Sequence, residues 1–196
     1  MTAHDPRTIR LADYQPFSHL VDQVSLTFQL DPQATRVLAR LNMRPNPAAR
    51  PGQELRLDGE GLALQGCRIS GVPVQAAADA TGLTLAAHLL PDGPFLLETE
   101  VLIAPAGNTA LEGLYMSNGM YCTQCEAEGF RKITFYPDRP DVMARFHVRI
   151  ESDLPVLLSN GNPVAQGAGW AEWDDPWPKP SYLFALVAGD LVNHPG

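Results

Sequence analysis

The chain has 196 residues, of which 45% are hydrophobic and 18% charged, a balance typical of a globular domain and not of a disordered segment. Its 22 acidic and 14 basic side chains give a formal net charge of −8, which repels nucleic-acid phosphates and anionic membrane surfaces. We therefore expect neither nucleic acid nor a membrane among its partners.

The first twenty residues contain no apolar run. They carry four charged side chains, Asp5, Arg7, Arg10 and Asp13. Such a segment is neither a secretory signal nor an anchor, and no later stretch reaches transmembrane length. The sequence predicts a cytoplasmic protein with one domain over residues 1–196, in which residues 1–20 are an extended lead-in.

Apolar and polar residues alternate over residues 24–30 and again over 37–43, separated by the turn sequence Asp31-Pro-Gln33. This pattern predicts two strands, each with one buried face, that pair as a hairpin. Further strand-like pieces occupy residues 54–57, 62–64, 67–69, 83–88 and 95–103. Turn signals recur about every ten residues and no long amphipathic helix is present, so we expect an all-β fold: a multi-stranded, largely antiparallel β-sandwich or saddle-like sheet.

The regular pattern stops within residues 105–145. Ala106-Gly-Asn108 and Ser117-Asn-Gly119 indicate loops, and a short helical or irregular segment is expected near 129–136, because Pro137 would end a helix there. Irregular backbone at the centre of a β domain is where binding residues collect. We therefore expect residues 105–145 to form the recognition segment.

Strand patterns return after this segment. Residues 146–150 alternate, and residues 156–158 form a second apolar piece, which is followed by a proline-rich stretch at 175–180. The last predicted strand, 182–187, is apolar on both faces. A strand of that kind belongs in the middle of a sheet.

The three cysteines are Cys67, Cys122 and Cys125, an odd number that argues against a disulfide framework. The spacing of Cys122 and Cys125 is also found in zinc and redox sites, but a structural zinc site needs a second ligand pair, and none has suitable spacing. We expect packed free thiols.

Three polar residues occupy alternate positions at Gln124, Glu126 and Glu128. If this segment is extended, they share one face, while Cys125 and Ala127 point to the other. Two carboxylates so close repel each other unless a cation lies between them, and a primary ammonium group with the Gln124 amide beside it fits this need. The alternative is that these residues are only the solvated face of a half-buried strand.

Further motifs surround these three residues and occupy most of the second half of the chain. They are Asn108-Thr-Ala-Leu-Glu-Gly-Leu-Tyr115, Gln124-Cys-Glu-Ala-Glu-Gly-Phe-Arg131, Tyr136-Pro-Asp-Arg-Pro-Asp-Val-Met-Ala-Arg-Phe146, Leu158-Ser-Asn-Gly-Asn162 and Pro178-Lys-Pro-Ser-Tyr-Leu-Phe-Ala-Leu-Val-Ala-Gly-Asp190. Together they resemble the N-terminal domain of the bacterial aminopeptidase N family, which are zinc exopeptidases. The similarity is patchy before about Pro105 and close from there on.

The resemblance implies roles for individual residues. Glu126 helps to hold the free α-amino group of a peptide substrate, and Gln124 lines the pocket for its first side chain. Arg131 and Asp138 match positions at which we expect a structural pair that braces the loop. The domain caps the active site of a parent enzyme that releases N-terminal amino acids from peptides.

The zinc-binding part of the family pattern is missing. None of the five histidines is followed by Glu or by a second His four residues later, so there is no His-Glu-x-x-His motif. We expect zinc in the full-length family enzyme and no cofactor in this chain. Alone, the chain is expected to be catalytically inert.

Two other roles remain open. The chain is alternatively a stand-alone β-sandwich module that binds peptides or proteins without catalysis. It is otherwise an interaction domain that associates with itself through a surface normally buried against the catalytic domain. In an excised domain we expect that surface as an apolar patch near residues 124–135.

Overall fold

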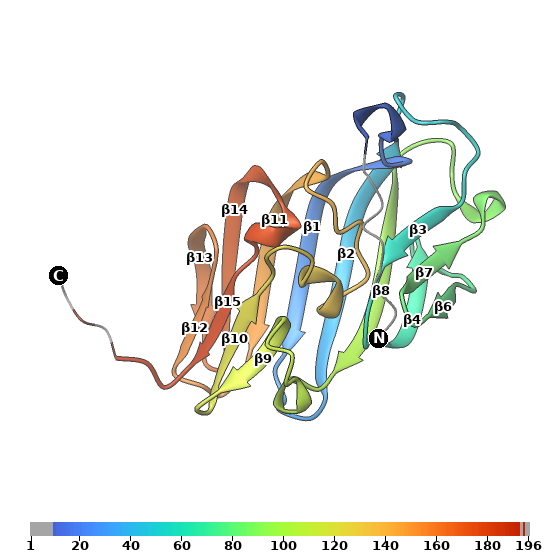
Figure 1. Ribbon diagram of the computed structural model, residues 1–196. Helices are drawn as coiled ribbons and strands as arrows, with labels where there is room; N and C mark the ends of the chain where they lie inside the picture. Colours follow the sequence, from blue (N-terminus) through green and yellow to red (C-terminus); the bar gives the residue numbers. More distant parts are fainter. Residues whose placement is uncertain (1–9, 193, 195–196) are drawn as a thin grey trace.

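The computed structural model describes residues 10–192 and 194, which form fifteen strands in three sheets (Figure 1). The strands are β1 (His19–Gln29), β2 (Thr35–Pro45), β3 (Leu55–Asp58), β4 (Ala63–Ile69), β5 (Val72–Pro73), β6 (Ala77–Asp79), β7 (Gly82–Leu85), β8 (Phe95–Ile103), β9 (Gly113–Ser117), β10 (Met120–Gln124), β11 (Met143–Glu151), β12 (Val156–Ser159), β13 (Asn162–Gly167), β14 (Trp170–Pro180) and β15 (Leu186–Gly189). Short 3-10 helices occupy Leu11–Asp13 (η1), Ala87–Leu89 (η2), Pro105–Gly107 (η3), Phe130–Lys132 (η4) and Ser181–Leu183 (η5). No helix in this described part of the chain is long and apolar enough to cross a membrane.

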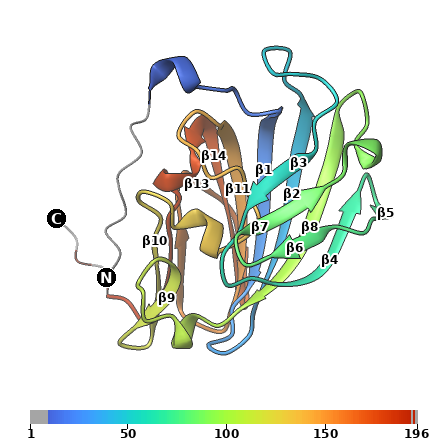
Figure 2. The ribbon, with the colours of Figure 1, turned by 45° about the vertical axis from the view of Figure 1, so that its right-hand side comes forward.

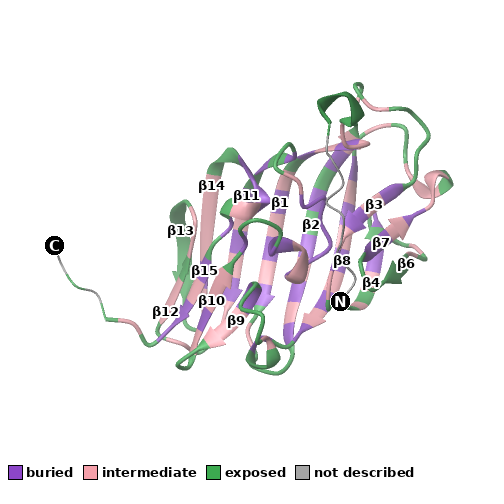
Figure 3. Ribbon diagram, viewed as in Figure 1, coloured by how far each residue is buried: buried purple, intermediate pink, exposed green. Residues whose placement is uncertain are grey.

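The largest sheet has eight strands in the order β13-β14-β11-β1-β2-β8-β4-β5. Its neighbours are antiparallel except β1 and β11, which run parallel with Val24 opposite Phe146. The predicted hairpin is confirmed as β1 and β2. Inner residues along these strands are buried and alternate with more exposed outer ones, as Figure 3 shows.

Two small sheets, β12-β15-β10-β9 and β3-β7-β6, cover the same face of the eight-stranded sheet (Figure 2). One hydrophobic core connects all three sheets. The predicted all-β, largely antiparallel fold is therefore confirmed.

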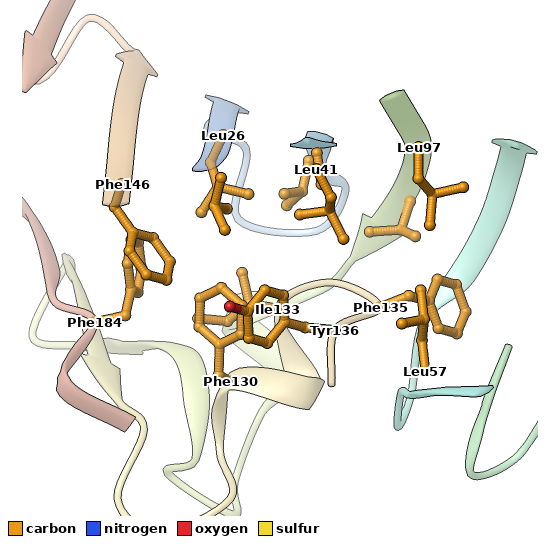
Figure 4. Close-up of a cluster of buried hydrophobic side chains, with 14 of the residues drawn as sticks. Leu26, Leu41, Leu57, Leu97, Phe130, Ile133, Phe135, Tyr136, Phe146 and Phe184 are labelled. Atoms are coloured by element: carbon orange, nitrogen blue, oxygen red, sulfur yellow. The ribbon is translucent and has the colours of Figure 1, made fainter. Parts of the chain in front are cut away.

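The space between the layers is filled by the irregular segment expected near 129–136. It contains η4, and its side chains Phe130, Ile133, Phe135 and Tyr136 are each at most 1% exposed. They face the large sheet across the core, as Figure 4 shows. The Phe130 ring packs edge-on against Tyr136, with ring centroids 5.1 Å apart. This segment gives the two layers a shared core.

The structure corrects two expectations about residues 105–145. The segment is not irregular throughout, because β9 and β10 form a hairpin within it. Its turn uses Asn118 (φ 49°) and Gly119 (φ 80°), the two positive φ values of a hairpin turn. The expected apolar patch near 124–135 is also wrong, because the large apolar side chains of that segment fill the core.

The last strand begins later than predicted. Residues 181–183 form η5, and β15 covers Leu186–Gly189 instead of 182–187. It lies between β12 and β10, so its predicted internal position is confirmed. The proline-rich stretch belongs to β14, whose pairing with β13 ends at Asp174, before the prolines. Of the lead-in, residues 1–9 lie outside the described residues, and β1 starts at His19.

Candidate functional site

The candidate site lies where β10 leaves the four-stranded sheet. The strand ends at Gln124, and the chain then turns, with the Gly129 N–H donating to the Cys125 carbonyl oxygen over 2.9 Å. A Cβ at Gly129 would lie 2.3 Å from the Gln124 carbonyl oxygen, so this turn requires glycine. Residues 125–129 are therefore not extended, so the condition under which Gln124, Glu126 and Glu128 would share one face is not met. Gln124, Glu126 and Glu128 are nevertheless all exposed.

Cys125 anchors the turn to the core. Its side chain is buried, whereas Ala127, which was expected to share its face, is exposed. Burial, with the charge of Asp138 as a smaller cause, raises the pKa of the Cys125 thiol to about 12. Cys67 is also buried, and the three cysteines are free, so the prediction of unpaired thiols is confirmed.

The two glutamates of the turn differ in their surroundings. A Glu128 carboxylate oxygen lies 3.3 Å from the Arg131 guanidinium, which also pairs with the buried Asp138. Glu126 has no ion pair with any residue in the described ranges 10–192 and 194. The Gln124 side-chain amide approaches the Glu126 backbone carbonyl at 3.4 Å. The structure thus brings Gln124 and Glu126 together and leaves the Glu126 carboxylate exposed.

A buried carboxylate holds the base of this turn. Asp138 is 4% exposed, and its Oδ2 accepts from the Arg131 backbone N–H at 3.1 Å and from Arg131 Nε at 3.2 Å. Its Oδ1 accepts from the Ser181 hydroxyl at 2.6 Å. The predicted pair of Arg131 and Asp138 is confirmed.

The Asp138 backbone N–H also donates to Asp58 Oδ2, at the end of β3, over 3.0 Å. Asp138 therefore joins the turn to η5 and to the three-stranded sheet. Sequence spacing gave no sign of Ser181 or Asp58, which lie 43 and 80 residues away from Asp138. Only the fold brings these four residues together.

We find no cluster of three or more His, Cys, Asp or Glu side chains within residues 10–192 and 194 that could hold a metal ion. The side chains of this part of the chain therefore do not fit a zinc site. What they form is an exposed Glu126 carboxylate, without an ion pair among the described residues, on a turn whose backbone carbonyl accepts from the neutral Gln124 amide. Such a group attracts a cationic ligand with N–H donors.

A family model for the peptidase M1 N-terminal domain matches residues 83–183, more than half of the chain. The chain belongs to this family. The match includes the β9–β10 hairpin, the turn with Glu126 and three members of the cluster around Asp138 (Arg131, Asp138 and Ser181), whereas the fourth, Asp58, lies before it.

Curated relatives agree with this assignment. The chain is 52% identical to aminopeptidase N of Caulobacter vibrioides over 97% of its length, and 48% identical to aminopeptidase N of Escherichia coli over 91%. The matched regions are 23% and 21% of those proteins, so the chain spans about a fifth of the relatives' length. It is thus similar to the N-terminal domain of an M1 aminopeptidase.

A solved structure shares the fold. The chain superposes on Legionella pneumophila aminopeptidase A, determined in complex with aspartic acid, with a TM-score of 0.85 and 33% identity. The superposition covers 94% of this chain and 23% of the Legionella chain. The likeness in fold therefore extends beyond residues 83–183, which the family model matches.

Proposed function

We propose that this chain is the substrate-recognition domain of a zinc aminopeptidase, and that it caps the active site of a parent enzyme that removes N-terminal amino acids from peptides. Glu126 binds the free α-ammonium group of the peptide, and Gln124 lines the pocket for the first side chain. The observation that supports this assignment is the difference between the two glutamates: Glu128 pairs with Arg131, whereas Glu126 is exposed and has no cation partner among residues 10–192 and 194.

A carboxylate at this position selects for a free N-terminus by charge. At about 4 Å, its attraction to an ammonium group is worth roughly 1 kcal/mol in water and roughly 4 kcal/mol at an effective dielectric constant of about 20. When the rest of the enzyme covers the site, the free energy of this attraction moves toward the second value. An N-acylated or internal peptide leaves the covered carboxylate without a partner, which costs free energy and rejects that peptide.

The proposal assigns recognition to this chain and hydrolysis to the rest of the enzyme. The residues described do not fit a zinc site, and the proposal assigns the zinc and the groups that activate water to the rest of the enzyme. The free cysteines agree with a reducing compartment, which supports a cytoplasmic enzyme. The chain alone is expected to leave aminoacyl substrates intact.

The test uses a chimeric enzyme in which this chain replaces the matching N-terminal region of Caulobacter vibrioides aminopeptidase N. We compare kcat/KM for an aminoacyl chromogenic substrate between the chimera and its E126Q and E128Q variants. Glu126→Gln is expected to lower kcat/KM roughly 5- to 1000-fold, following the electrostatic range above. Glu128→Gln, at the other glutamate of the same turn, is the matched control. It is expected to change kcat/KM less than about threefold.

The relative rate on an N-acetylated peptide provides the second measurement. Because the Glu126→Gln variant lacks the charge that rejects a neutral N-terminus, its preference for free over acetylated peptides is expected to fall. Equal small effects of the two substitutions would contradict the assignment of Glu126. Hydrolysis of the aminoacyl substrate by the 196-residue chain alone would contradict the assignment of hydrolysis to the rest of the enzyme.

A further inference from the structure

The segment that precedes β1 is bound to the loop between η4 and β11. We call residues 10–18 the N-terminal strap. The Tyr14 hydroxyl donates to Asp141 Oδ2 over 2.8 Å, and the Gln15 carbonyl oxygen accepts from Arg139 Nη2 over 2.8 Å. Tyr14 and Asp141 are 127 residues apart in the sequence, so the fold alone brings the strap to this loop.

Arg139 is at the centre of this contact. Its Nε and Nη2 donate to the two carboxylate oxygens of Asp141 over 2.9 and 2.7 Å. The rings of Tyr14 and Phe17 lie beside the guanidinium, with their centroids 5.9 and 6.0 Å from its Cζ. A bidentate ion pair with two aromatic neighbours fixes the direction of the Arg139 side chain more firmly than a single exposed ion pair does.

The strap is also fixed at its other end. The Asn46 backbone N–H donates to the Ser18 carbonyl oxygen over 3.0 Å, and the Asn46 side-chain amide donates to the Phe17 carbonyl oxygen over 2.9 Å. Asn46 directly follows β2. The strap therefore connects the eight-stranded sheet to the loop that carries Arg139.

The same loop carries the buried Asp138. Asp138 and Arg139 are adjacent, and their backbone is tightly turned, because the Arg139 N–H donates to the Pro137 carbonyl oxygen over 2.8 Å. Asp138 Oδ2 accepts from the backbone N–H of Arg131, which follows Glu126 by five residues. A displacement of Arg139 therefore moves the acceptor at the base of the Glu126 turn.

We propose that Arg139, held by the N-terminal strap, positions the Glu126 carboxylate for the α-ammonium group of the peptide substrate. The proposal rests on the proposed function and adds a positioning residue to it. Arg139 acts through two other residues: it fixes Asp138, and Asp138 fixes Arg131 and the turn.

The consequence falls on substrate binding. A charge-assisted hydrogen bond between a carboxylate and an ammonium group needs a separation of about 2.7–2.9 Å, so a shift of Glu126 by about 1 Å breaks it. The groups that cleave the peptide bond belong to the rest of the enzyme and stay in place. Loss of Arg139 should therefore raise KM much more than it lowers kcat.

The test is a double-mutant cycle in the same chimeric enzyme. Arg139→Ala is made alone and together with Glu126→Gln, and kcat and KM for the aminoacyl chromogenic substrate are measured for each protein. Alone, Arg139→Ala is expected to raise KM about tenfold and to change kcat less than about threefold. It is also expected to weaken the preference for free over acetylated peptides. In the Glu126→Gln background, it should change kcat/KM less than about twofold, because no carboxylate is left to position.

Arg36→Ala is the matched control. Arg36 pairs with Glu100 at 2.7 Å on the outer face of the large sheet, and its side chain is 40% exposed, against 34% for Arg139. This substitution removes a similar ion pair far from the strap, and it is expected to leave KM and the preference for free peptides unchanged.

Tyr14→Phe is a second, milder variant, because it removes a single hydroxyl from the strap and keeps the ring beside Arg139. It is expected to raise KM about threefold in the chimera and to have no effect in the Glu126→Gln background. If Arg139→Ala does not fold, Tyr14→Phe alone decides the test.

Equal increases of KM with and without the Glu126 carboxylate would overturn the proposal, because Arg139 would then act on the enzyme by another route. An unchanged KM in both Arg139→Ala and Tyr14→Phe would overturn it as well. Both results leave the amine site intact as long as Glu126→Gln alone lowers kcat/KM. If Glu126→Gln alone has no effect, the amine site itself is removed, and the role of the strap with it.

Discussion

The two main sheets of this domain have outer faces of opposite character. On the eight-stranded sheet, outer residues form ion pairs between neighbouring strands, such as Arg36 with Glu100 at 2.7 Å and Arg149 with Glu172 at 2.7 Å. On the four-stranded sheet, the outward residues Tyr115, Cys122, Val187 and Leu158, which lie opposite one another across its strands and are called the outer row, are uncharged. One chain thus builds a charged outer face and an uncharged outer face on opposite sides of a common core.

Adjacent residues of β15 test this comparison most strongly. Leu186→Ala removes a fully buried side chain from the core and is expected to lower the free energy of unfolding by about 2–5 kcal/mol. Val187→Ala, on the outer face, is expected to cost under about 1 kcal/mol in the isolated chain. Urea denaturation measures both. Equal losses would mean that the outer row is already packed within this chain.

The cluster of Asp138 with Arg131, Ser181 and Asp58 is expected to give the next largest effect, because it ties the turn to η5 and to the three-stranded sheet. Asp138→Ala leaves Arg131 and Ser181 without their buried acceptor and should lower the free energy of unfolding by about 2–3 kcal/mol. Glu112→Ala removes an exposed partner of Lys132 and should cost at most about 1 kcal/mol. A loss for Asp138→Ala no greater than for this control would show that the cluster does not brace the turn.

The charged face of the large sheet should contribute less. Arg149 pairs with Glu151 and Glu172, and its guanidinium stacks on the Trp170 ring at 4.2 Å. Because these groups are about one third exposed, Arg149→Ala is expected to cost at most about 1 kcal/mol, and less in high salt. Denaturation at low and high ionic strength measures the difference. A larger, salt-independent loss would mean that this face is not simply solvated.

The smallest expected effect is the pH dependence of stability that His19 contributes. This residue begins β1 and is buried. Burial lowers the pKa of His19 below its ordinary value of about 6.5. The unfolded chain then binds a proton more readily than the folded one, so the contribution of neutral His19 is fully present above about pH 6.5 and is lost as the pH falls toward the folded pKa.

His19→Gln should therefore show a weaker decline in stability between about pH 7 and pH 5 than the unchanged chain. His147→Gln, on the outer face of β11, is the control. Thermal unfolding across this pH range measures the slopes. An unchanged slope in His19→Gln would exclude a role for His19 in the acid sensitivity of this domain.

The sequence predicted the regular part of this fold because strand periodicity is a local signal. The alternation over 24–30, 37–43 and 95–103 corresponds to β1, β2 and β8, whose inner residues are buried. The short strands β9 and β10 escaped detection, because five residues with apolar groups on both faces show little alternation.

The site was predicted only in part. Resemblance pointed to Glu126, Gln124 and the pair of Arg131 with Asp138, but the extended backbone that a shared face for Gln124, Glu126 and Glu128 would need is a turn in the structure. Alternate spacing predicts a shared face only where the backbone stays extended. Here, the close approach of Gly129 to Gln124 bends it.

By itself, the sequence determined the all-β class, the main hairpin and the residues that carry the family motifs, because these follow from local patterns. The tertiary structure decided which glutamate keeps a free carboxylate, which distant residues surround Asp138, and that four separate strands align an uncharged row. Each depends on contacts between residues far apart in the chain, and no local pattern records how those segments meet.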